Sequence, residues 1–481
     1  MKTRRFLRNI ALSVVVITLT AFLLVWGLER IRRLTSPPAR PGNPVGEPET
    51  APRSTPIVSP PGRSVGAPPT AVRTEAYTKI GGAEYHSHGY LGQGVTVGVI
   101  DTQFDGIQAA IDAGELPRSL TTKRLTADGM LLDDLRTGTG AHGTACAEVI
   151  YDLAPEAHLY LLQVDDFLGT AEHIFDVLER ADVRIVSVSL SVLAMGRADG
   201  SGMLGTPPVP IYRILDQAYL ERYMLIVMSA GNYARQHYAA RFRDFDGDHF
   251  HEFRERLQDG ETETLTVNAR SGDAFFIHLS WDDWGPYPLA PAAESDYDLF
   301  IYNENGELVA SSTIAQQGDM PPVESVRVRA SEATTYAIRI RRASRTVGSH
   351  NLRMWVTGTG HPLHGWQTPA GSLGAPADAE AVVTVGAANV ATGHRNATSS
   401  QGPTADGRIK PDVTSYAFVS VSNPAYGTRG FRGSSAATPH VAGIAALLME
   451  RKGWAITAPE LRAELLSFAA DHGISGPDST W

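Results

Sequence analysis

Cysteine is nearly absent from the sequence, since Cys146 is the only one among 481 residues. One thiol cannot form an internal disulfide, and it excludes a zinc site built from several cysteines. Basic residues are also in the minority, with 42 Lys and Arg against 52 Asp and Glu. The first 33 residues carry a net charge of +6, so the rest of the chain carries −16. This acidic body argues against a nucleic acid as partner.

Charged residues are missing altogether from residues 10–28, which are mainly apolar. Nineteen helical residues span about 28 Å, close to the roughly 30 Å hydrocarbon core of a bilayer. Four basic residues precede the run and three follow it. We therefore expect residues 1–33 to form a single-pass anchor in the cell membrane, with the globular body extracytoplasmic, either periplasmic or extracellular. A cleaved signal peptide is the alternative, although no small-x-small cleavage site lies near Trp26.

A proline-rich segment follows the apolar run. Eleven prolines lie between Pro37 and Pro69, mixed with glycine, serine and threonine. Such a composition cannot bury a core and favours an extended, semi-rigid chain. The sequence therefore predicts a linker at residues 34–74 that holds the globular part away from the membrane.

Strand-like and helix-like segments alternate in the next part of the chain. Strands are expected at 94–101, 158–164, 184–190 and 223–229, with helices at 171–181 and 211–222. This order predicts an α/β fold with a mostly parallel sheet and helices on both faces. The pattern resumes near residue 381 and ends in a helix that contains Pro439, which we expect in its first turn. Residues 75–240 and 361–481 are thus expected to form one discontinuous domain.

Between these two parts the apolar period changes. Short runs alternate apolar and polar residues, as at 335–341, and Asn305-Gly306 separates two of them. Alternation and an Asn-Gly turn are typical of antiparallel hairpins, so residues 241–360 are expected to form an inserted antiparallel β-sandwich. Near its start, the segment Asp244–Glu252 carries oxygen ligands at alternate positions. Its glycine comes two places early for an EF-hand, and both a structural calcium ion and a charged surface loop are open interpretations.

Four polar residues stand where such a fold places its chemistry. Asp101 ends a strand, Asn232 follows the strand at 223–229, His142 lies among glycines, and Ser435 is expected at the start of a helix. Free backbone N–H groups at a helix start would suit a developing oxyanion near Ser435. Taken singly, each residue has an ordinary interpretation as a turn residue, a helix cap or a satisfied core histidine.

Taken together, these stretches resemble the subtilisin-like serine protease family (peptidase S8, the subtilases). The matching segments are V-I-D-T-Q-F-D around Asp101, A-H-G-T-A-C-A-E around His142, V-S-L-S at 188–191, S-A-G-N ending at Asn232, and G-S-S-A-A-T-P-H-V-A-G around Ser435. They occur in the order of the family and span roughly residues 85–240 and 360–475. The resemblance implies a serine endopeptidase that acts on proteins or peptides.

The resemblance also implies a role for each matching residue. Ser435 would be the nucleophile, since Ser434 occupies the family's threonine position, and His142 would be the base, oriented by Asp101. Asn232 and the Ser435 backbone N–H would stabilise the oxyanion. The substrate-binding residues would be Ser189, Leu190, Ser191 and Gly231. The chemistry requires no cofactor and no catalytic metal, while structural calcium is compatible with it.

Some features depart from the family pattern or need a separate interpretation. Gln103 and Ser191 stand where the family often has glycine. Cys146, four residues after His142, is expected to be a buried filler, because nothing near it would lower its pKa. The inserted sandwich resembles small β-domains of bacterial secreted peptidases, with a role in binding or in stability. The sequence thus predicts a membrane-anchored extracytoplasmic serine endopeptidase, and the alternative is a catalytically inactive peptide-binding protein with the same cleft.

Overall fold

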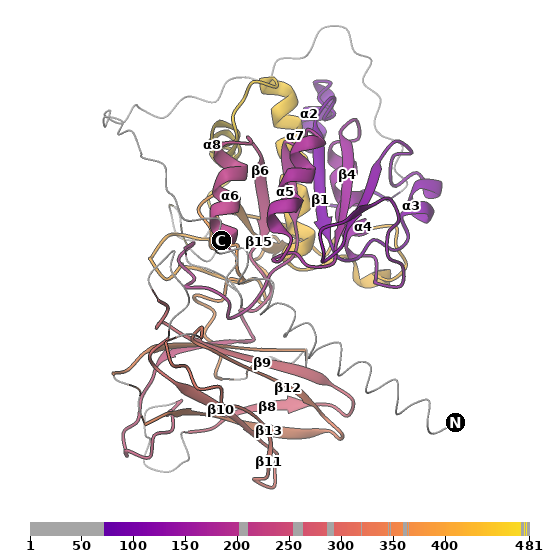
Figure 1. Cartoon of the computed structure of the whole chain (residues 1–481). Helices are drawn as coiled ribbons and strands as arrows, with labels where there is room; N and C mark the ends of the chain where they lie inside the picture. Colours follow the sequence, from indigo (N-terminus) through magenta and orange to yellow (C-terminus); the bar gives the residue numbers. More distant parts are fainter. Residues whose placement is uncertain are drawn as a thin grey trace, which may run out of the picture.

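The computed structural model describes residues 72–472 apart from 202–209, 254–262, 286–292, 319, 345, 347, 359–362 and 364, together with residues 476 and 478. The predicted membrane anchor and nearly all of the predicted linker lie outside the described residues. Within these ranges, no helix combines the length and hydropathy that crossing a bilayer requires. Figure 1 shows two parts, one built on a mainly parallel sheet with helices and one built from antiparallel strands.

An eight-stranded sheet forms the centre of the first part. Its strands are β1 (Thr96–Asp101), β2 (Thr121–Leu125), β3 (Leu131–Leu132), β4 (His158–Val164), β5 (Ile185–Val188), β6 (Leu225–Ser229), β15 (Val382–Asn389) and β16 (Val413–Ala417). They lie in the order β16-β15-β6-β5-β1-β4-β2-β3. Every neighbouring pair is parallel except β2 and β3. The mostly parallel sheet expected from the sequence is therefore confirmed.

Helices cover both faces of this sheet, as the alternating pattern predicts. They are α2 (Gly82–Ser87), α3 (Ile107–Ala113), α4 (His142–Leu153), α5 (Ala171–Arg180), α6 (Ile211–Leu220), α7 (Ser434–Lys452) and α8 (Ala458–Ser467), with a 3-10 turn, η2 (Gly427–Arg429). A Cβ on Gly98 of β1 would meet Leu178 and Val183, so α5 covers the face on which Gly98 lies. The side chain of Asp101 lies on the other face, because side chains alternate along a strand. Figure 1 shows α5 and α6 together in front of the sheet.

Residues 237–357 form the second part, called the two-sheet region below. Its strands are β7 (His237–Arg241), β8 (Leu265–Ala269), β9 (Ala274–Trp281), β10 (Tyr297–Tyr302), β11 (Leu308–Ser312), β12 (Val323–Arg329), β13 (Thr334–Arg342) and β14 (Asn351–Thr357). They form two antiparallel sheets, β11-β10-β13-β8 and β12-β9-β14-β7. Side chains from both sheets, including Trp281, Leu299 and Ile340, share one buried core. The Asn305-Gly306 turn connects β10 to β11, as its sequence predicts.

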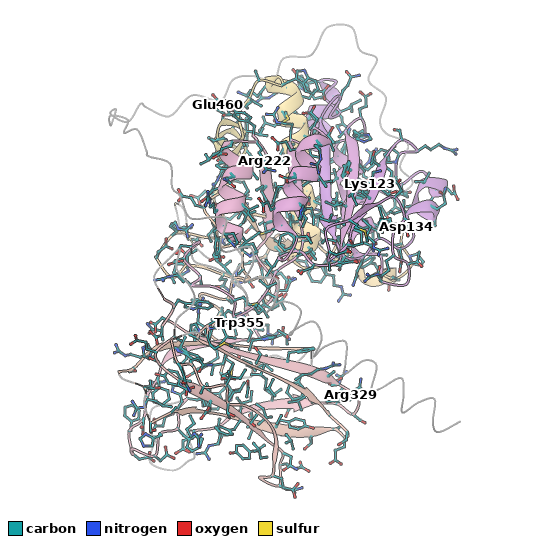
Figure 2. All side chains as sticks on the ribbon, in the orientation of Figure 1. Lys123, Asp134, Arg222, Arg329, Trp355 and Glu460 are labelled. Carbon is teal, nitrogen blue, oxygen red and sulfur yellow. The ribbon has the colours of Figure 1, made fainter. Side chains whose placement is uncertain are left out.

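The two parts touch beside the residues that follow β5. Arg353 of β14 donates a hydrogen bond to the Gly196 carbonyl at 3.0 Å, and Arg197 donates to the Gly285 carbonyl at 2.8 Å. Figure 2 shows Trp355 on the side of the two-sheet region that faces the parallel sheet. The two-sheet region therefore packs against the segment that continues the predicted substrate strand.

Candidate active site

Asp101 and His142 are in direct contact. His142 Nδ1 lies 2.6 Å from Asp101 Oδ2, and the carboxylate is almost fully buried. Asp101 Oδ1 accepts hydrogen bonds from the backbone N–H groups of Thr102 and Gln103 at 2.8 and 3.1 Å. A carboxylate held in this way accepts the Nδ1 proton of a neutral imidazole, which leaves Nε2 free to accept another proton.

Glycine makes the close approach of β1 and α4 feasible. A Cβ on Gly143 would lie 2.6 Å from Asp101 Cβ and 2.6 Å from the Phe104 ring. The Gly143 N–H donates to the Gln103 carbonyl at 2.7 Å, which ties the first turn of α4 to the turn after β1. Gln103, which departs from the family pattern, is accommodated by Gly140, since a Cβ there would lie 2.6 Å from Gln103 Oε1.

Ser435 is the second residue of α7, at the helix start predicted from the sequence. The prediction that Pro439 lies in the first turn is wrong, because α7 begins at Ser434 and Pro439 is its sixth residue. Pro439 lacks the N–H that would bond the Ser435 carbonyl in a regular helix. Two side chains donate to that carbonyl instead, Ser189 Oγ at 3.3 Å and Cys146 Sγ at 3.7 Å. The first turn of α7 is thus fixed to α4 and to the end of β5.

Asn232 lies against the start of α7. Its Oδ1 accepts the Ser434 backbone N–H at 2.9 Å, and this fixes the orientation of the side-chain amide. A Cβ on Gly433 would lie 2.6 Å from Asn232 Oδ1 and 2.8 Å from Nδ2, and Gly433 has a φ of 73°. Only glycine therefore suits position 433. Neither Asn232 Nδ2 nor the Ser435 N–H has a hydrogen-bond partner in the described part of the chain, so both donors remain available.

Cys146 connects the base to the nucleophile candidate. Its Sγ, one carboxylate oxygen of Asp101 and one ring nitrogen of His142 all lie within 4.8 Å of one another. Burial raises the pKa of the Cys146 thiol well above its usual value, which makes it a poor nucleophile and a poor metal ligand. The described residues show no hydrogen bond between Ser435 Oγ and His142 Nε2. The structure thus places the two residues in adjoining helix turns without joining their side chains.

The predicted substrate strand is open along its backbone. Residues 189–191 follow β5, and within the described residues their backbone groups make no hydrogen bonds; pairing resumes where Val192 bridges Ala375. Leu190 packs against the core. An unpaired extended segment can add a peptide as a further strand. Gly231, the remaining predicted substrate-binding residue, has a φ of 98° and donates its N–H to Ser434 Oγ at 3.2 Å.

Sequence reasoning missed Tyr233, which follows Asn232 directly. The Tyr233 hydroxyl lies 2.8 Å from Ser191 Oγ, and its backbone N–H donates to Ser400 Oγ at 3.0 Å. It also missed Phe431, whose ring meets the His142 imidazole edge-on with centroids 5.5 Å apart. In the sequence, Tyr233 is marked only by its position directly after the motif residue Asn232. Nothing comparable in the sequence marks Phe431.

Comparison with known proteins supports the family. The Subtilase family model, peptidase S8, matches residues 290–480, a range that includes Ser435. The structure resembles that of the Clostridium perfringens CspB protease, with a TM-score of 0.53, 16% identity, and coverage of 83% of this chain and 94% of that chain. Over residues 290–480 the chain is thus similar to the subtilase family. A weaker likeness links it to MycP1 from Mycobacterium smegmatis, with a TM-score of 0.40, 14% identity, and coverage of 88% of this chain and 84% of that chain.

The family match indicates the general activity. The protein is a subtilisin-like serine protease, and the matched family implies proteins or peptides as substrates. The family match begins inside the two-sheet region and does not reach Asp101, His142 or Asn232. The roles of these three residues therefore depend on the geometry described above.

Proposed function

We propose that this protease hydrolyses internal peptide bonds with Ser435 as nucleophile, His142 as general base and Asp101 as the residue that orients the imidazole. The observation that carries the proposal is the 2.6 Å contact between His142 Nδ1 and Asp101 Oδ2, beside the first turn of α7. Because Nδ1 donates to Asp101, the Nε2 atom is the one that can accept the Ser435 proton. We expect substrate binding to close that pair, because catalytic hydrogen bonds are often long or poorly aligned in unliganded enzymes.

The reaction then follows two balanced steps. Ser435 Oγ attacks the scissile carbonyl carbon while its proton moves to His142 Nε2. The C–N bond breaks, and the same proton passes to the leaving amine. Water next gives a proton to His142 and attacks the acyl-enzyme, and the imidazole returns that proton to Ser435 as the acid product leaves. Asp101 stabilises the imidazolium in both steps and keeps its own charge.

Two donors are proposed to stabilise the oxyanion, Asn232 Nδ2 and the Ser435 backbone N–H. The bond from Ser434 N–H to Asn232 Oδ1 supports this assignment, because it turns the amide nitrogen away from Ser434. The N-terminus of α7 adds a positive partial charge at the same place. In well-studied enzymes of this kind, removal of one such donor lowers turnover by about 10²–10³.

We also propose that the protease acts outside the cytoplasm, attached to the cell membrane. Support comes from the uncharged run at residues 10–28 and the proline-rich segment that follows it. Fractionation of the full-length protein tests this part separately. Recovery of a soluble mature chain that begins after residue 28 would contradict the anchor, without affecting the proposed chemistry.

Incubation with a mixture of unstructured peptides tests the catalytic proposal. We expect wild-type protein to generate new N-termini that mass spectrometry can detect, and Ser435→Ala to generate none. Ser434→Ala is the matched control, because it removes the neighbouring hydroxyl from the same helix turn; it should retain cleavage. The lack of a hydrogen bond between Ser435 and His142 in the described residues favours one second candidate, a peptide-binding protein without catalysis. Folded wild-type protein that binds peptides and leaves all of them intact would establish that candidate.

A further inference from the structure

An acidic loop connects the two sheets of the two-sheet region. The chain leaves β7 in one sheet, and residues 249–251 then pair with β13 in the other sheet. Phe250 bridges Arg341, the His251 N–H donates to the Ile340 carbonyl at 2.9 Å, and the Arg342 N–H donates to the His249 carbonyl at 2.9 Å. An interaction that stabilises this loop therefore also stabilises the passage of the chain from β7 in one sheet to β13 in the other.

Three carboxylates converge inside this loop. Oxygen atoms of Asp244, Asp246 and Glu252 all lie within 4.8 Å of one another. Asp246 also belongs to a second set of oxygens, with Asp248 and Glu263. Like charges so close together are unfavourable unless a cation lies among them.

Glu252 sets this group apart from a solvated acidic patch. Only 3% of the residue is exposed. Its Oε1 accepts the Phe245 N–H at 2.8 Å, and its Oε2 is buried with no hydrogen-bond partner among the residues that the structure describes. Leaving a buried carboxylate oxygen without a partner is costly. The unpartnered oxygen belongs to the carboxylate that faces Asp244 and Asp246, so it indicates a missing positive partner.

The cations already present do not supply that partner. Arg342 pairs with Asp244 Oδ2 at 2.9 Å, and Arg339 pairs with Glu263 and lies 3.8 Å from Asp248. Arg339 therefore neutralises part of the second set of carboxylates, and Arg342 neutralises Asp244 in the first set. Within the described residues, neither reaches an oxygen of Asp246 or Glu252. Histidine does not supply it either. Tyr238 and the Arg243 N–H occupy the two ring nitrogens of His251, and the exposed His249 reaches only Asp244 Oδ2, at 3.8 Å.

We propose that Asp244, Asp246 and Glu252 bind one Ca²⁺ ion, which fixes the crossing from β7 to β13. A donor set made only of carboxylate oxygens suits a hard cation, and the partly exposed loop leaves room for water or backbone carbonyls to complete six to eight ligands. Zinc prefers nitrogen and sulfur ligands, which this group lacks. Oxygen atoms within 4.8 Å of one another can share one Ca²⁺, because two Ca–O bonds of about 2.3–2.6 Å span that range. Ca²⁺ also tolerates the irregular geometry of a loop, whereas Mg²⁺ requires a near-ideal octahedron.

The site has a structural consequence for the two-sheet region. Phe242 and Phe253 flank the acidic segment, and His251 lies within it. These three residues pack with Tyr238 and Tyr297 through ring contacts at 4.9–5.9 Å. A cation that holds the carboxylates together keeps this aromatic cluster closed. Calcium binding is therefore expected to stabilise the fold by mass action.

The experiment uses the full chain, stripped of metal with a chelator that is then removed, and measures Ca²⁺ binding by equilibrium dialysis together with Tm. We expect Asp246→Asn, a change at an exposed position, to bind one Ca²⁺ fewer than wild type or to bind it at least about tenfold more weakly. Its Tm should also rise less when calcium is added. Glu252→Gln should behave alike. Glu332→Gln, which removes an exposed carboxylate from the turn between β12 and β13, is the matched control and should retain wild-type binding.

Two results would overturn the proposal. One is equal calcium stoichiometry and affinity in wild type, Asp246→Asn and Glu332→Gln, which would make the acidic segment a charged surface loop. The other is a Tm of stripped wild type that calcium leaves unchanged. Calcium bound elsewhere in the protein does not affect the comparison of stoichiometry and affinity, because that comparison uses differences between variants. Peptide cleavage is not part of the readout, so the test is independent of the proposed catalytic mechanism.

Discussion

The hydroxyl of Tyr233 lies 2.8 Å from the hydroxyl of Ser191, and this contact joins the residue after Asn232 to the end of the predicted substrate strand. The tyrosine ring occupies the space beside that strand, since a Cβ on Gly231 would lie 2.6 Å from it and a Cβ on Gly374 would lie 3.3 Å from it. Under the proposed mechanism, the side chain of the substrate residue before the scissile bond must lie next to Ser191 and Asn232. We therefore expect Tyr233 to limit the size of that side chain.

Replacing Tyr233 should broaden the choice of substrate. We expect Tyr233→Ala to raise kcat/KM for peptides with a large apolar residue before the scissile bond by about tenfold relative to peptides with alanine there, because a hydrophobic pocket discriminates by such factors. Peptides that differ only at this position provide the measurement. Tyr233→Phe keeps the ring and removes only the hydroxyl, so its preference should remain close to wild type. An unchanged preference in Tyr233→Ala would show that the ring does not line this part of the cleft.

Asp101→Asn tests the role of the buried carboxylate. An asparagine of the same shape cannot act as the charged acceptor for His142 Nδ1–H, so the imidazole loses its fixed tautomer and its imidazolium loses a counter-charge. We expect kcat to fall by about 10⁴, as it does for this change in other triads, while KM changes little. Steady-state kinetics with one peptide give both values, and circular dichroism verifies the fold. A decrease in kcat of less than tenfold would contradict the assigned role.

Acid should destabilise the protein through its buried histidines. His440 is fully buried between the Ala436 carbonyl and the Thr74 hydroxyl, and burial lowers its pKa to about 4. In the unfolded chain the pKa of histidine is near 6.5. The unfolded chain therefore binds a proton at a higher pH than the folded protein does. The stability contributed by neutral His440 is present above about pH 6.5 and is lost as the pH falls toward 4. The total loss is on the order of 3 kcal/mol.

Denaturant unfolding at several pH values between 7 and 4.5 measures this effect. The free energy of unfolding should fall less steeply with decreasing pH in His440→Gln than in wild type. His158→Gln, at an exposed position, serves as the control and should keep the wild-type slope. His237 and His251, whose pKa values burial lowers to about 4 and about 3, should give the same sign when replaced. Equal slopes in His440→Gln and wild type would refute the explanation.

Cys146 should be unreactive in the folded protein. Its thiol is 1% exposed, and burial raises its pKa well above the usual value, so almost no thiolate forms near neutral pH. We expect iodoacetamide to leave both the peptidase activity and the mass of the native chain unchanged over hours, and to modify Cys146 once denaturant is added. Intact-mass spectrometry records both states. Rapid loss of activity with alkylation of native Cys146 would instead indicate that the thiol takes part in the chemistry.

Local patterns predicted those parts of the structure that depend on neighbours along the chain. Apolar periods located β4 at His158–Val164, and helix-start chemistry located Ser435 at the beginning of α7. The error at Pro439 has a tertiary cause. Its missing N–H frees the Ser435 carbonyl, and Ser189 and Cys146, both distant in sequence, satisfy that carbonyl. No local rule contains those two donors.

Contacts between distant segments account for the features that the sequence did not reveal. In the sequence, Gly433 looks like any glycine that precedes a helix. Its role becomes clear only in the fold, where a Cβ on Gly433 would lie 2.6 Å from Asn232 Oδ1. Glu252 reads as one more charge in an acidic segment, because its burial results from the pairing of residues 249–251 with β13. The sequence could suggest calcium in that segment, but only the fold reveals which carboxylate lacks a partner.

Labelling by a fluorophosphonate probe tests the central assignment most directly, because the probe forms a covalent bond only with an activated serine. We expect wild-type protein to gain the mass of one phosphonyl group on a peptide that contains Ser435, and Ser434→Ala to gain it equally. Ser435→Ala and His142→Ala should gain none. Folded wild-type protein that remains unlabelled, or a label that persists in Ser435→Ala, would contradict the account.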